Sequence, residues 1–316
     1  MNCSMKLLSA ALFALSLPCH AGATREAANN YNDNLFIAAP HVEEEIRSFS
    51  GIGNAKPERA ISDPALLASA ALVIDQTTGS VLFEKNADAL QPIASITKLM
   101  TAIVVLEAQQ PLNQMLSVTR ADVELARPTQ SRLKVGALLS RGELLRLMLM
   151  ASENRAAAVL ARSFPGGLQS FVRRMNEVAL AQGLHSTRFA DPTGLSAGNL
   201  STARDLTSLV RHAYRFDAIR AYSTTPEYAV SLRRARATLF HNTNRLTRNA
   251  DWEIGLSKTG YISASGQCLV LQASVGGRPM VMVILDSWGK GGRVEDAVRL
   301  RHWLEQRNDR VIVAGL

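Results

Sequence analysis

Strand-like segments stand near both ends of this 316-residue chain, and helix-like segments fill the middle. The first, residues 69–86, has two apolar runs on either side of a turn at Gly79, which is typical of a β-hairpin. Three more apolar runs come late in the chain, and the last two flank a Gly-Gly turn as a second hairpin; they are residues 254–262, 267–275 and 279–287. This order predicts one antiparallel sheet built from both ends of the chain.

The middle of the chain favours helices of ordinary length. Its helix-like segments place apolar residues at helical spacing, and they are residues 95–110, 141–164, 167–184 and 201–216. We expect Pro111 to end the first helix and the second segment to break near Ala151 to Asn154. A last helix is expected over residues 293–306. Because the strands and helices are segregated along the chain, the α+β class follows.

The first 23 residues have the three parts of a secretory signal peptide. Lys6 precedes an apolar run from Leu7 to Leu17, and Ala21-Gly-Ala23 offers a cleavage site. The apolar run is shorter than the roughly 20 residues that span a bilayer. We therefore expect export, with an uncleaved anchor as the alternative; a lipoprotein is disfavoured because Pro18 precedes Cys19.

The rest of the chain is expected to hold one large domain. Residues 24–60 are polar without sustained periodicity and predict a flexible leader. The domain should span residues 61–309 and leave a tail at 310–316. Once the signal is removed, Cys268 is the only cysteine, so no internal disulfide is expected. The net charge of +8 suits an anionic partner, but scattered basic residues without interleaved aromatics argue against nucleic acid.

The start of segment 95–110 brings a serine and a lysine together. Ser95 and Lys98 are three residues apart, so in a helix they share one face. A serine hydroxyl needs an adjacent base to become a nucleophile, and a lysine can be that base when burial or nearby cations lower its pKa. Apolar neighbours such as Leu99 and Ile103 make burial of Lys98 plausible. The alternative is a helix-capping serine beside a solvated lysine.

Two further motifs favour the catalytic interpretation. Ser152-Glu-Asn154 lies in the expected helix break, where the serine can relay a proton and the amide can orient a substrate. Lys258-Thr259-Gly260 lies on an expected strand and offers a positive charge, a hydroxyl and a close backbone approach. Each motif has an ordinary alternative, a helix cap for the first and a solvent-facing strand residue before a turn for the second. Three such motifs in this order indicate one site.

With these motifs the sequence resembles the penicillin-binding proteins and serine β-lactamases. Neighbouring strings narrow the resemblance to the low-molecular-mass D-alanyl-D-alanine peptidases, and among them to the endopeptidase branch of the penicillin-binding protein seven type; they are PIASITKLMTA, ASENRAAAVLA, DPTGLS, STARDL, NTNRL and LSKTGYISASGQCLV. The resemblance covers residues 64–306. It implies a five-stranded antiparallel sheet flanked by helices, a mostly helical lobe, and an active site between them. Glu153 departs from the Asp or Gly of many relatives, although the endopeptidase branch tolerates Glu.

The resemblance also implies a role for each motif residue. Ser95 would be acylated, and Lys98 would take its proton. Ser152 would pass that proton towards the leaving amine, while Asn154 would hold the substrate amide. The remaining substrate-binding residues are implied on one strand; they are Lys258, Thr259, Gly260 and Tyr261.

Within that strand, Lys258 and Thr259 would bind the substrate carboxylate. The oxyanion hole would use the backbone N–H groups of Ser95 and Tyr261. Water would then hydrolyse the acyl-enzyme, and no metal or organic cofactor is needed. The scattered histidines form no His-x-x-x-His pair, which also gives no reason to expect a metal site.

The same resemblance implies partners and a location. Crosslinked peptidoglycan would be the substrate, β-lactam antibiotics covalent inhibitors, and the periplasm the compartment, with at most peripheral membrane association. Cleavage of D-Ala to diaminopimelate crosslinks is expected, but a carboxypeptidase that removes the terminal D-Ala stays open, because both reactions break the bond after D-Ala. Carboxypeptidase relatives often carry a second β domain, whereas here 56 residues follow Gly260, enough for a hairpin and a helix.

Two more remote alternatives remain. A serine β-lactamase is disfavoured because no Glu-x-x-Leu-Asn string lies between Ser152 and Lys258. A non-catalytic wall-binding protein with the same fold is disfavoured because every motif residue is present.

Overall fold

A computed structural model describes residues 62–126, 129–232 and 237–314. The expected signal peptide, residues 1–23, and the expected leader, residues 24–60, lie outside the described residues. Within the described part of the chain, no helix has both the length and the apolar character needed to cross a membrane.

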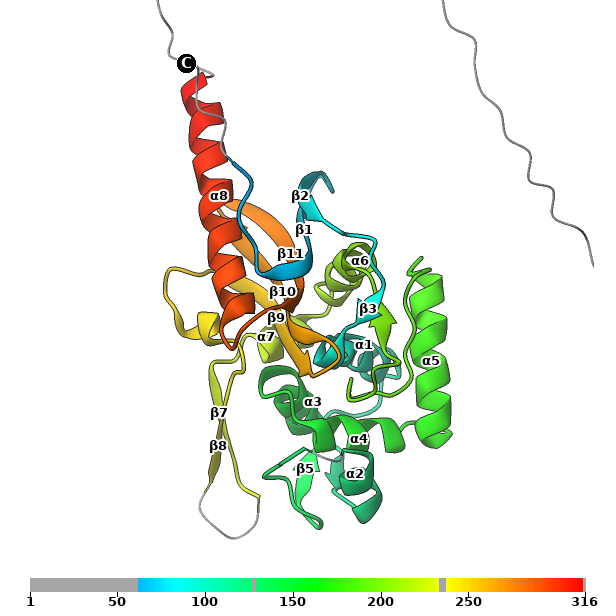
Figure 1. Cartoon of the computed structure of the whole chain (residues 1–316). Coiled ribbons are helices and arrows are strands. Elements are labelled where there is room, and N and C mark those ends of the chain that lie inside the picture. Colours follow the sequence, from blue (N-terminus) through cyan, green and yellow to red (C-terminus); the bar gives the residue numbers. More distant parts are fainter. Residues whose placement is uncertain (1–61, 127–128, 233–236, 315–316) are drawn as a thin grey trace, which may run out of the picture. The chain divides into compact units, whose positions relative to one another are not determined.

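A five-stranded antiparallel sheet forms the centre of the domain (Figure 1). Its strand order is β2-β1-β11-β10-β9, so the first hairpin of the chain pairs directly with the last. The strands are β1 (Ala68–Asp75), β2 (Val81–Lys85), β9 (Ile254–Ile262), β10 (Gly266–Val275) and β11 (Arg278–Ser287). The prediction of a five-stranded antiparallel sheet built from both ends of the chain is confirmed.

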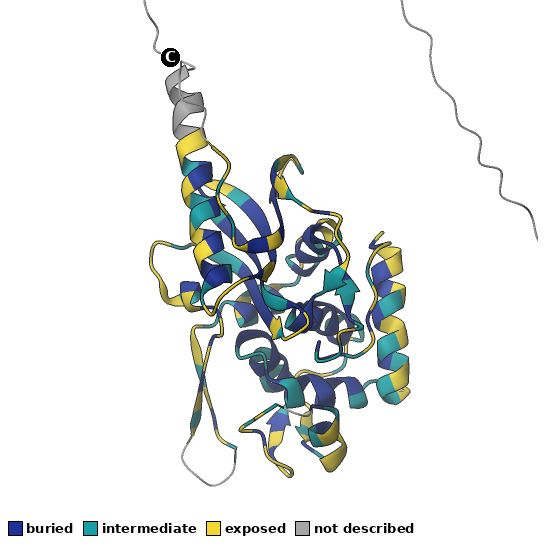
Figure 2. Cartoon of the chain, viewed as in Figure 1, coloured by how far each residue is buried: buried dark blue, intermediate teal, exposed yellow. Residues whose placement is uncertain are grey.

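Alternating side chains of the central strands enter two separate apolar layers. In β1, Leu72 and Ile74 face the layer that also contains the lobe helices. Ala71 and Val73 face the opposite layer, which is closed by the apolar side chains of α8 (Gly292–Ala314). The middle strands are therefore buried on both faces, as the dark blue ribbon of Figure 2 shows. Burial on both faces explains why these strands are continuous apolar runs in the sequence.

Helices cover the other face of the sheet and form a second lobe (Figure 1). α6 (Ala203–Ala213) packs on β11 and β1, and α1 (Lys98–Glu107) contacts α6 on one side and the lobe helices on the other. The lobe helices are α2 (Arg120–Leu125), α3 (Arg141–Met150), α4 (Asn154–Arg162), α5 (Gly167–Ala181) and α7 (Asp217–Ser223). These elements confirm the α+β class with a mostly helical lobe.

The structure also contains short elements that the sequence did not predict. Three two-stranded pairs lie outside the main sheet; they are β3 (Gln91–Pro92) with β6 (Leu200–Ser201), β4 (Met115–Ser117) with β5 (Leu138–Ser140), and β7 (Glu227–Val230) with β8 (Thr238–His241). A 3-10 turn, η2 (Arg245–Arg248), precedes β9. The last helix is longer than expected, since α8 begins at Gly292 and continues to Ala314.

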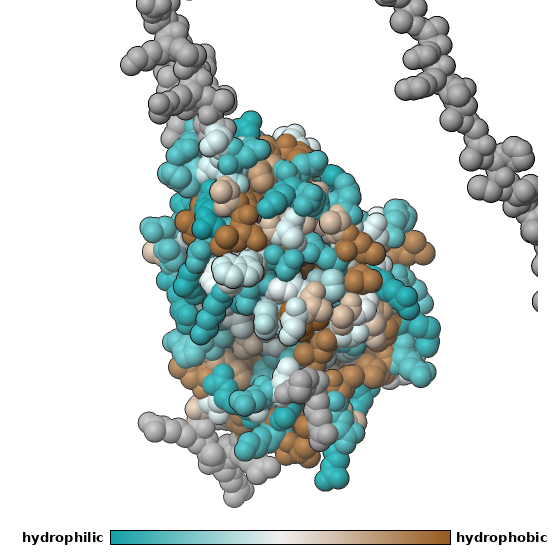
Figure 3. Space-filling view, viewed as in Figure 1, coloured by the Kyte–Doolittle hydropathy of each residue, from teal (hydrophilic) through white to brown (hydrophobic). Residues whose placement is uncertain are grey.

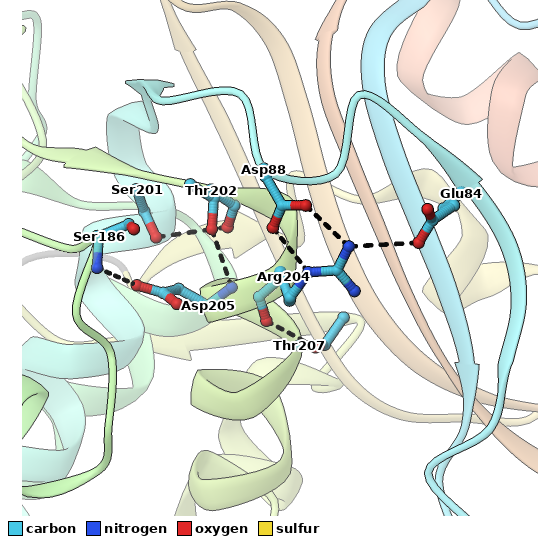
Figure 4. Close-up of polar contacts among 8 residues, drawn as sticks. All are labelled: Glu84, Asp88, Ser186, Ser201, Thr202, Arg204, Asp205 and Thr207. Atoms are coloured by element: carbon cyan, nitrogen blue, oxygen red, sulfur yellow. Dashed lines mark hydrogen bonds and ion pairs between the residues drawn. The ribbon is translucent and has the colours of Figure 1, made fainter.

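The start of α6 shows what the STARDL string does in the fold (Figure 4). The Thr202 hydroxyl accepts a hydrogen bond of 3.0 Å from the Asp205 backbone N–H and thereby caps the helix. Arg204 forms ion pairs with Asp88 at 2.6 Å and with Glu84 at 3.3 Å. The string therefore fixes where α6 begins and ties that end of the helix to β2 and the segment after it.

Candidate active site

Ser95 and Lys98 lie where a 3-10 turn leads into α1. The turn, η1, comprises Ala94–Thr97, and the α-helix proper begins at Lys98. The expectation of a regular helix starting at Ser95 is therefore wrong by one turn. The hypothesis of a capping serine is also wrong, because Ile93 holds the N-cap position of η1 and no side chain caps that turn. The Ser95 hydroxyl instead accepts a hydrogen bond of 2.7 Å from Lys98 Nζ.

The Lys98 ammonium is buried and fully hydrogen-bonded. Besides Ser95, its Nζ donates to Asn154 Oδ1 at 2.6 Å and to the Thr193 carbonyl oxygen at 2.5 Å. A lysine ammonium has three N–H donors, so each of them has an acceptor here. Two elements thus hold this amine in one position, α4 through Asn154 and the loop before β6 through Thr193.

Burial shifts the Lys98 amine towards its neutral form. Loss of solvation lowers the pKa of Lys98 from 10.5 to about 7, and the negative charges of Asp191 and Glu153 partly oppose this shift. Near neutral pH, a substantial fraction of the molecules therefore carries an amine with a free lone pair. Such an amine, 2.7 Å from the Ser95 hydroxyl, can accept the serine proton.

The Asp191-Pro-Thr-Gly194 loop packs directly on the backbone of Ser95. Gly194 has a φ of +81°, and a Cβ at this position would lie 2.0 Å from the Ala94 carbonyl oxygen. Burial alone would raise the pKa of Asp191, but hydrogen bonds from Thr193 and from backbone N–H groups of the loop lower it overall. The sequence did not predict the contact of this loop with Lys98.

Ser152 lies in the break between α3 and α4, as the sequence predicted. Its φ is +56°, and Ala94 beside Ser95 has a φ of +46°. A non-glycine residue in this left-handed region costs about 1–2 kcal/mol, so both positions are held by their surroundings. The Ser152 hydroxyl accepts a hydrogen bond of 2.9 Å from Lys258 Nζ, which reaches it from β9.

Lys258 is as deeply buried as Lys98, with only 1% of its surface exposed. Its Nζ also donates to the Thr259 carbonyl oxygen at 2.8 Å. Burial lowers the pKa of Lys258 well below its usual value, and the positive charges of Lys98 and Arg293 lower it further. A bound carboxylate would offset this repulsion and restore the charge on the Lys258 amine.

Gly260 brings β9 against the turn that carries Ser95. A Cβ on Gly260 would lie 3.0 Å from the Ile93 carbonyl oxygen and 3.1 Å from the Ser95 nitrogen. A side chain would therefore push the two backbones apart, as the glycine of this motif suggested. Tyr261 follows at the point where the strand becomes solvent-exposed. β9 is an edge strand, since β10 is its only strand partner among the described residues.

Three supporting contacts come from residues outside the three motifs. Thr243 and Thr259 share a hydrogen bond of 2.6 Å between their hydroxyls, and Asn244 Nδ2 donates to Ser257 Oγ at 2.8 Å. These bonds tie the Asn242-Thr-Asn244 segment to β9, the strand that follows it. Arg293, at the start of α8, donates to the Gly260 carbonyl oxygen at 2.8 Å. Sequence reasoning missed Arg293, because nothing distinguishes it from the other arginines of the chain.

The predicted site residues thus meet between the sheet and the helical lobe. Ser95, Lys98 and Asn154 share one set of hydrogen bonds, and Ser152 is bonded to Lys258. In the described ranges, no three His, Cys, Asp or Glu side chains lie close enough to share a metal ion. A hydroxyl beside a buried amine, with a second amine across the site, suits acyl transfer through a serine.

Comparison with known proteins identifies the protein family. Residues 57–289 match the family model described as D-alanyl-D-alanine carboxypeptidase. A D-alanyl-D-alanine endopeptidase from Pseudomonas aeruginosa is 47% identical over 241 residues, which cover 76% of this chain and 78% of the relative. A protein of the same name from Escherichia coli is 39% identical over 272 residues, which cover 86% of each chain.

Solved structures give the same result at the level of the fold. The crystal structure of a DD-transpeptidase from a Streptomyces strain superposes with a TM-score of 0.72 at 28% identity, covering 77% of this chain and 98% of that one. The fold is therefore that of the penicillin-binding serine D,D-peptidases. The chain belongs to the D-alanyl-D-alanine carboxypeptidase family, and the resemblance on which the sequence analysis relied is confirmed.

Proposed function

We propose that this protein is a periplasmic serine D-alanyl-D-alanine endopeptidase that remodels the cell wall. It hydrolyses D-Ala to diaminopimelate crosslinks of peptidoglycan through an acyl-enzyme on Ser95. The observation that carries the chemistry is the 2.7 Å contact between Ser95 Oγ and the buried Lys98 amine with a pKa of about 7. The names of the two relatives support the endopeptidase reaction, and the signal-like segment that ends at Ala23 supports the compartment.

Acylation begins with proton transfer from Ser95 to neutral Lys98. The freed Ser95 oxygen attacks the D-Ala carbonyl carbon, and negative charge develops on the carbonyl oxygen. The backbone N–H groups of Ser95 and Tyr261 stabilise this charge. The close approach of Gly260 to the Ser95 nitrogen supports that pairing, because it brings the two backbone segments together.

As the C–N bond breaks, Ser152 gives a proton to the leaving amine and is reprotonated from Lys98, so that the proton taken from Ser95 reaches the leaving group and Lys98 is neutral again. The Ser152 hydroxyl is held for this relay by its bond to Lys258. The side-chain oxygen of Asn154 accepts a hydrogen bond from Lys98, so its NH₂ group remains available to donate to the substrate amide. Lys258 and Thr259 bind the substrate carboxylate on the sheet side of the site. Water then attacks the acyl-enzyme and releases the shortened peptide, with Lys98 again as the base.

β-Lactam antibiotics should acylate Ser95 as covalent inhibitors, because they present a reactive amide and a carboxylate to the same groups. The carboxypeptidase reaction is the second candidate, since the matching family model carries that description. Both reactions leave the same acyl group on Ser95 and differ only in the amine that departs. A serine β-lactamase would differ at deacylation, and rapid turnover of a chromogenic cephalosporin would identify it.

Digestion of purified muropeptides tests the proposed function. Conversion of crosslinked dimers to monomers means an endopeptidase, and loss of a single D-Ala from pentapeptides means a carboxypeptidase. Ser95→Ala, purified in the same way, is the control for contaminating hydrolases. Intact dimers and intact pentapeptides after prolonged incubation with the wild-type protein would contradict the proposal.

A further inference from the structure

A groove of about 640 Å³ opens at the end of β9, next to the candidate active site. It lies between the β9–β10 turn and the loop that joins β11 to α8. Its lining residues include Tyr261, Ser263, Gln267, Asp286 and Trp288. Tyr261 directly follows Gly260, so the groove begins where the predicted substrate-binding strand ends.

Two exposed aromatic rings line this groove. Trp288 is 80% exposed, the highest fraction among the large apolar side chains of the described residues, and Tyr261 is 58% exposed. On the face shown in Figure 3, apolar side chains lie in several patches among polar ones. Aromatic rings left in solvent on the wall of a groove are typical of ligand contact, because their large apolar faces would otherwise be buried.

A β-bulge sets the position of the loop that carries Trp288. The pairing of β10 with β11 shifts between Gln267, opposite Ser287, and Leu269, opposite Ile284, which leaves one extra residue in β11. Asp286, inside the bulge, has a φ of +50°. Bulges commonly redirect side chains beside functional sites. Here the bulge ends two residues before Trp288.

Buried hydrogen bonds then hold the base of this loop. The Ser287 hydroxyl donates to Asp296 Oδ2 at 2.7 Å, and Asp296 is fully buried in α8. The other oxygen of Asp296 accepts the Leu67 backbone N–H at 2.9 Å, and the Trp288 backbone N–H donates to the Leu67 carbonyl oxygen at 3.2 Å. The ring is therefore presented from an ordered base, which lowers the entropy cost of binding a ligand.

Polar atoms complete the groove. Gln267 Oε1 is buried, and no hydrogen-bond partner for it exists among the described residues. The carboxylate of Asp286 lies against Gly266, where a Cβ would come within 2.1 Å of Asp286 Oδ1. Two acceptors beside aromatic faces suit a sugar, since a pyranose ring has an apolar C–H face and a rim of hydroxyl and amide donors.

The position along β9 also fits a sugar attached to the substrate. Residues 256–260 of the strand are buried and Tyr261 is exposed, so a peptide lying along β9 reaches solvent at the Tyr261 end. At about 3.3 Å per residue, Ser263 lies roughly 10 Å beyond Gly260. A peptidoglycan stem has three residues between its acylating D-Ala and the glycan, and three extended residues span about the same length.

We propose that this groove is a subsite for a sugar ring of the glycan strand that carries the substrate peptide. Trp288 stacks on the C–H face of the ring, and Gln267 and Asp286 accept hydrogen bonds from its N–H and O–H groups. The subsite rests on the proposed D,D-peptidase function and deepens it. It makes the enzyme selective for stem peptides that are still attached to glycan.

The test compares two forms of one substrate, crosslinked dimers with their disaccharides and the same dimers after enzymatic removal of the sugars. We expect wild-type protein to prefer the sugar-bearing form by about tenfold in kcat/KM, mainly through KM. Trp288→Ala should bring the ratio of the two kcat/KM values close to one, and Trp288→Phe should keep part of the preference. Leu180→Ala removes another exposed apolar side chain, on α5, and should leave the ratio at the wild-type value.

A wild-type ratio of one, or an equal loss on both substrates in Trp288→Ala, would overturn the sugar subsite. Acylation of the wild-type protein by benzylpenicillin reports on Ser95 independently of any sugar. If acylation and cleavage both fail, the proposed function is wrong. Calorimetric binding of a disaccharide-tripeptide and of the sugar-free tripeptide then still decides the subsite, because the first should bind about tenfold more tightly than the second, and only in protein that retains Trp288.

Discussion

Two buried lysines lie on opposite sides of the candidate site, in opposite electrostatic surroundings. Lys98, on the helical side, is near the acidic groups of Asp191 and Glu153, which oppose the effect of burial and leave its pKa at about 7. Lys258, on the sheet side, is near the cations Lys98 and Arg293, which add to the effect of burial. Both pKa values are lowered, but the neighbouring charges act in opposite directions.

This difference suits two different tasks. A base must be partly neutral at the working pH, and the carboxylates near Lys98 keep its pKa from falling too far below neutrality. A carboxylate-binding group works best in a positive potential, and the cations around Lys258 give that side of the site such a potential. The bound carboxylate of the substrate would supply on the sheet side what Asp191 and Glu153 supply on the helical side.

The largest expected loss of activity comes from Lys98→Met, on the helical side of the site. This substitution keeps the approximate length of the side chain and removes the amine. The rate of Ser95 acylation by a fluorescent penicillin should fall by about 10³-fold, because no base remains beside the hydroxyl. Lys134→Met, at an exposed lysine of the same lobe, should acylate at the wild-type rate. Acylation of Lys98→Met within tenfold of wild type would show that this lysine is not the base.

Lys258→Met, on the sheet side of the site, should reduce activity less than Lys98→Met does, and the size of the loss should depend on the substrate. We expect kcat/KM to fall by about 10- to 100-fold for a substrate with a free carboxylate, since a charge-assisted hydrogen bond is lost. The same substrate with this carboxylate amidated should be affected much less. Equal losses on the two substrates would mean that Lys258 acts only through Ser152 and does not bind the anion.

The smallest expected effect is on the pH dependence of kcat/KM, which reports on the charges around Lys98. Because protonated Lys98 cannot act as a base, kcat/KM should fall as the pH drops below about 7. Glu153→Gln removes a negative charge that favours the protonated form of Lys98, so the pKa of Lys98 falls. The acid limb of the pH profile, where kcat/KM falls with falling pH, should therefore move to lower pH by less than about one unit. Glu177→Gln, at an exposed position on α5, should not move the limb. A shift of the limb to higher pH in Glu153→Gln would contradict the described surroundings of Lys98.

The sequence was most informative where a short pattern decides the local structure. Continuous apolar runs predicted the central strands, and the segment predicted over residues 254–262 coincides with β9. The break around Ser152 was predicted because residues on both sides favour helices and the intervening Ser-Glu-Asn string does not. These features depend on neighbours in the sequence, and tertiary packing agrees with them.

The missed features depend on contacts between distant segments. The 3-10 turn at Ser95 follows from the packing of Gly194 and Gly260 on its backbone, and these glycines lie far along the chain. Likewise, the bond from Lys98 to the Thr193 carbonyl oxygen spans 95 residues, and Arg293 reaches Gly260 across 33. No local pattern predicts a backbone acceptor or selects one arginine among many.

The central claim is that Ser95 is a nucleophile activated by its contact with Lys98. Mass spectrometry of the protein after brief incubation with benzylpenicillin tests it most directly. We expect one penicilloyl adduct per chain, located on the peptide that contains Ser95, and no adduct on folded Ser95→Ala. An unmodified wild-type protein, or an adduct on another residue such as Ser152, would contradict the account.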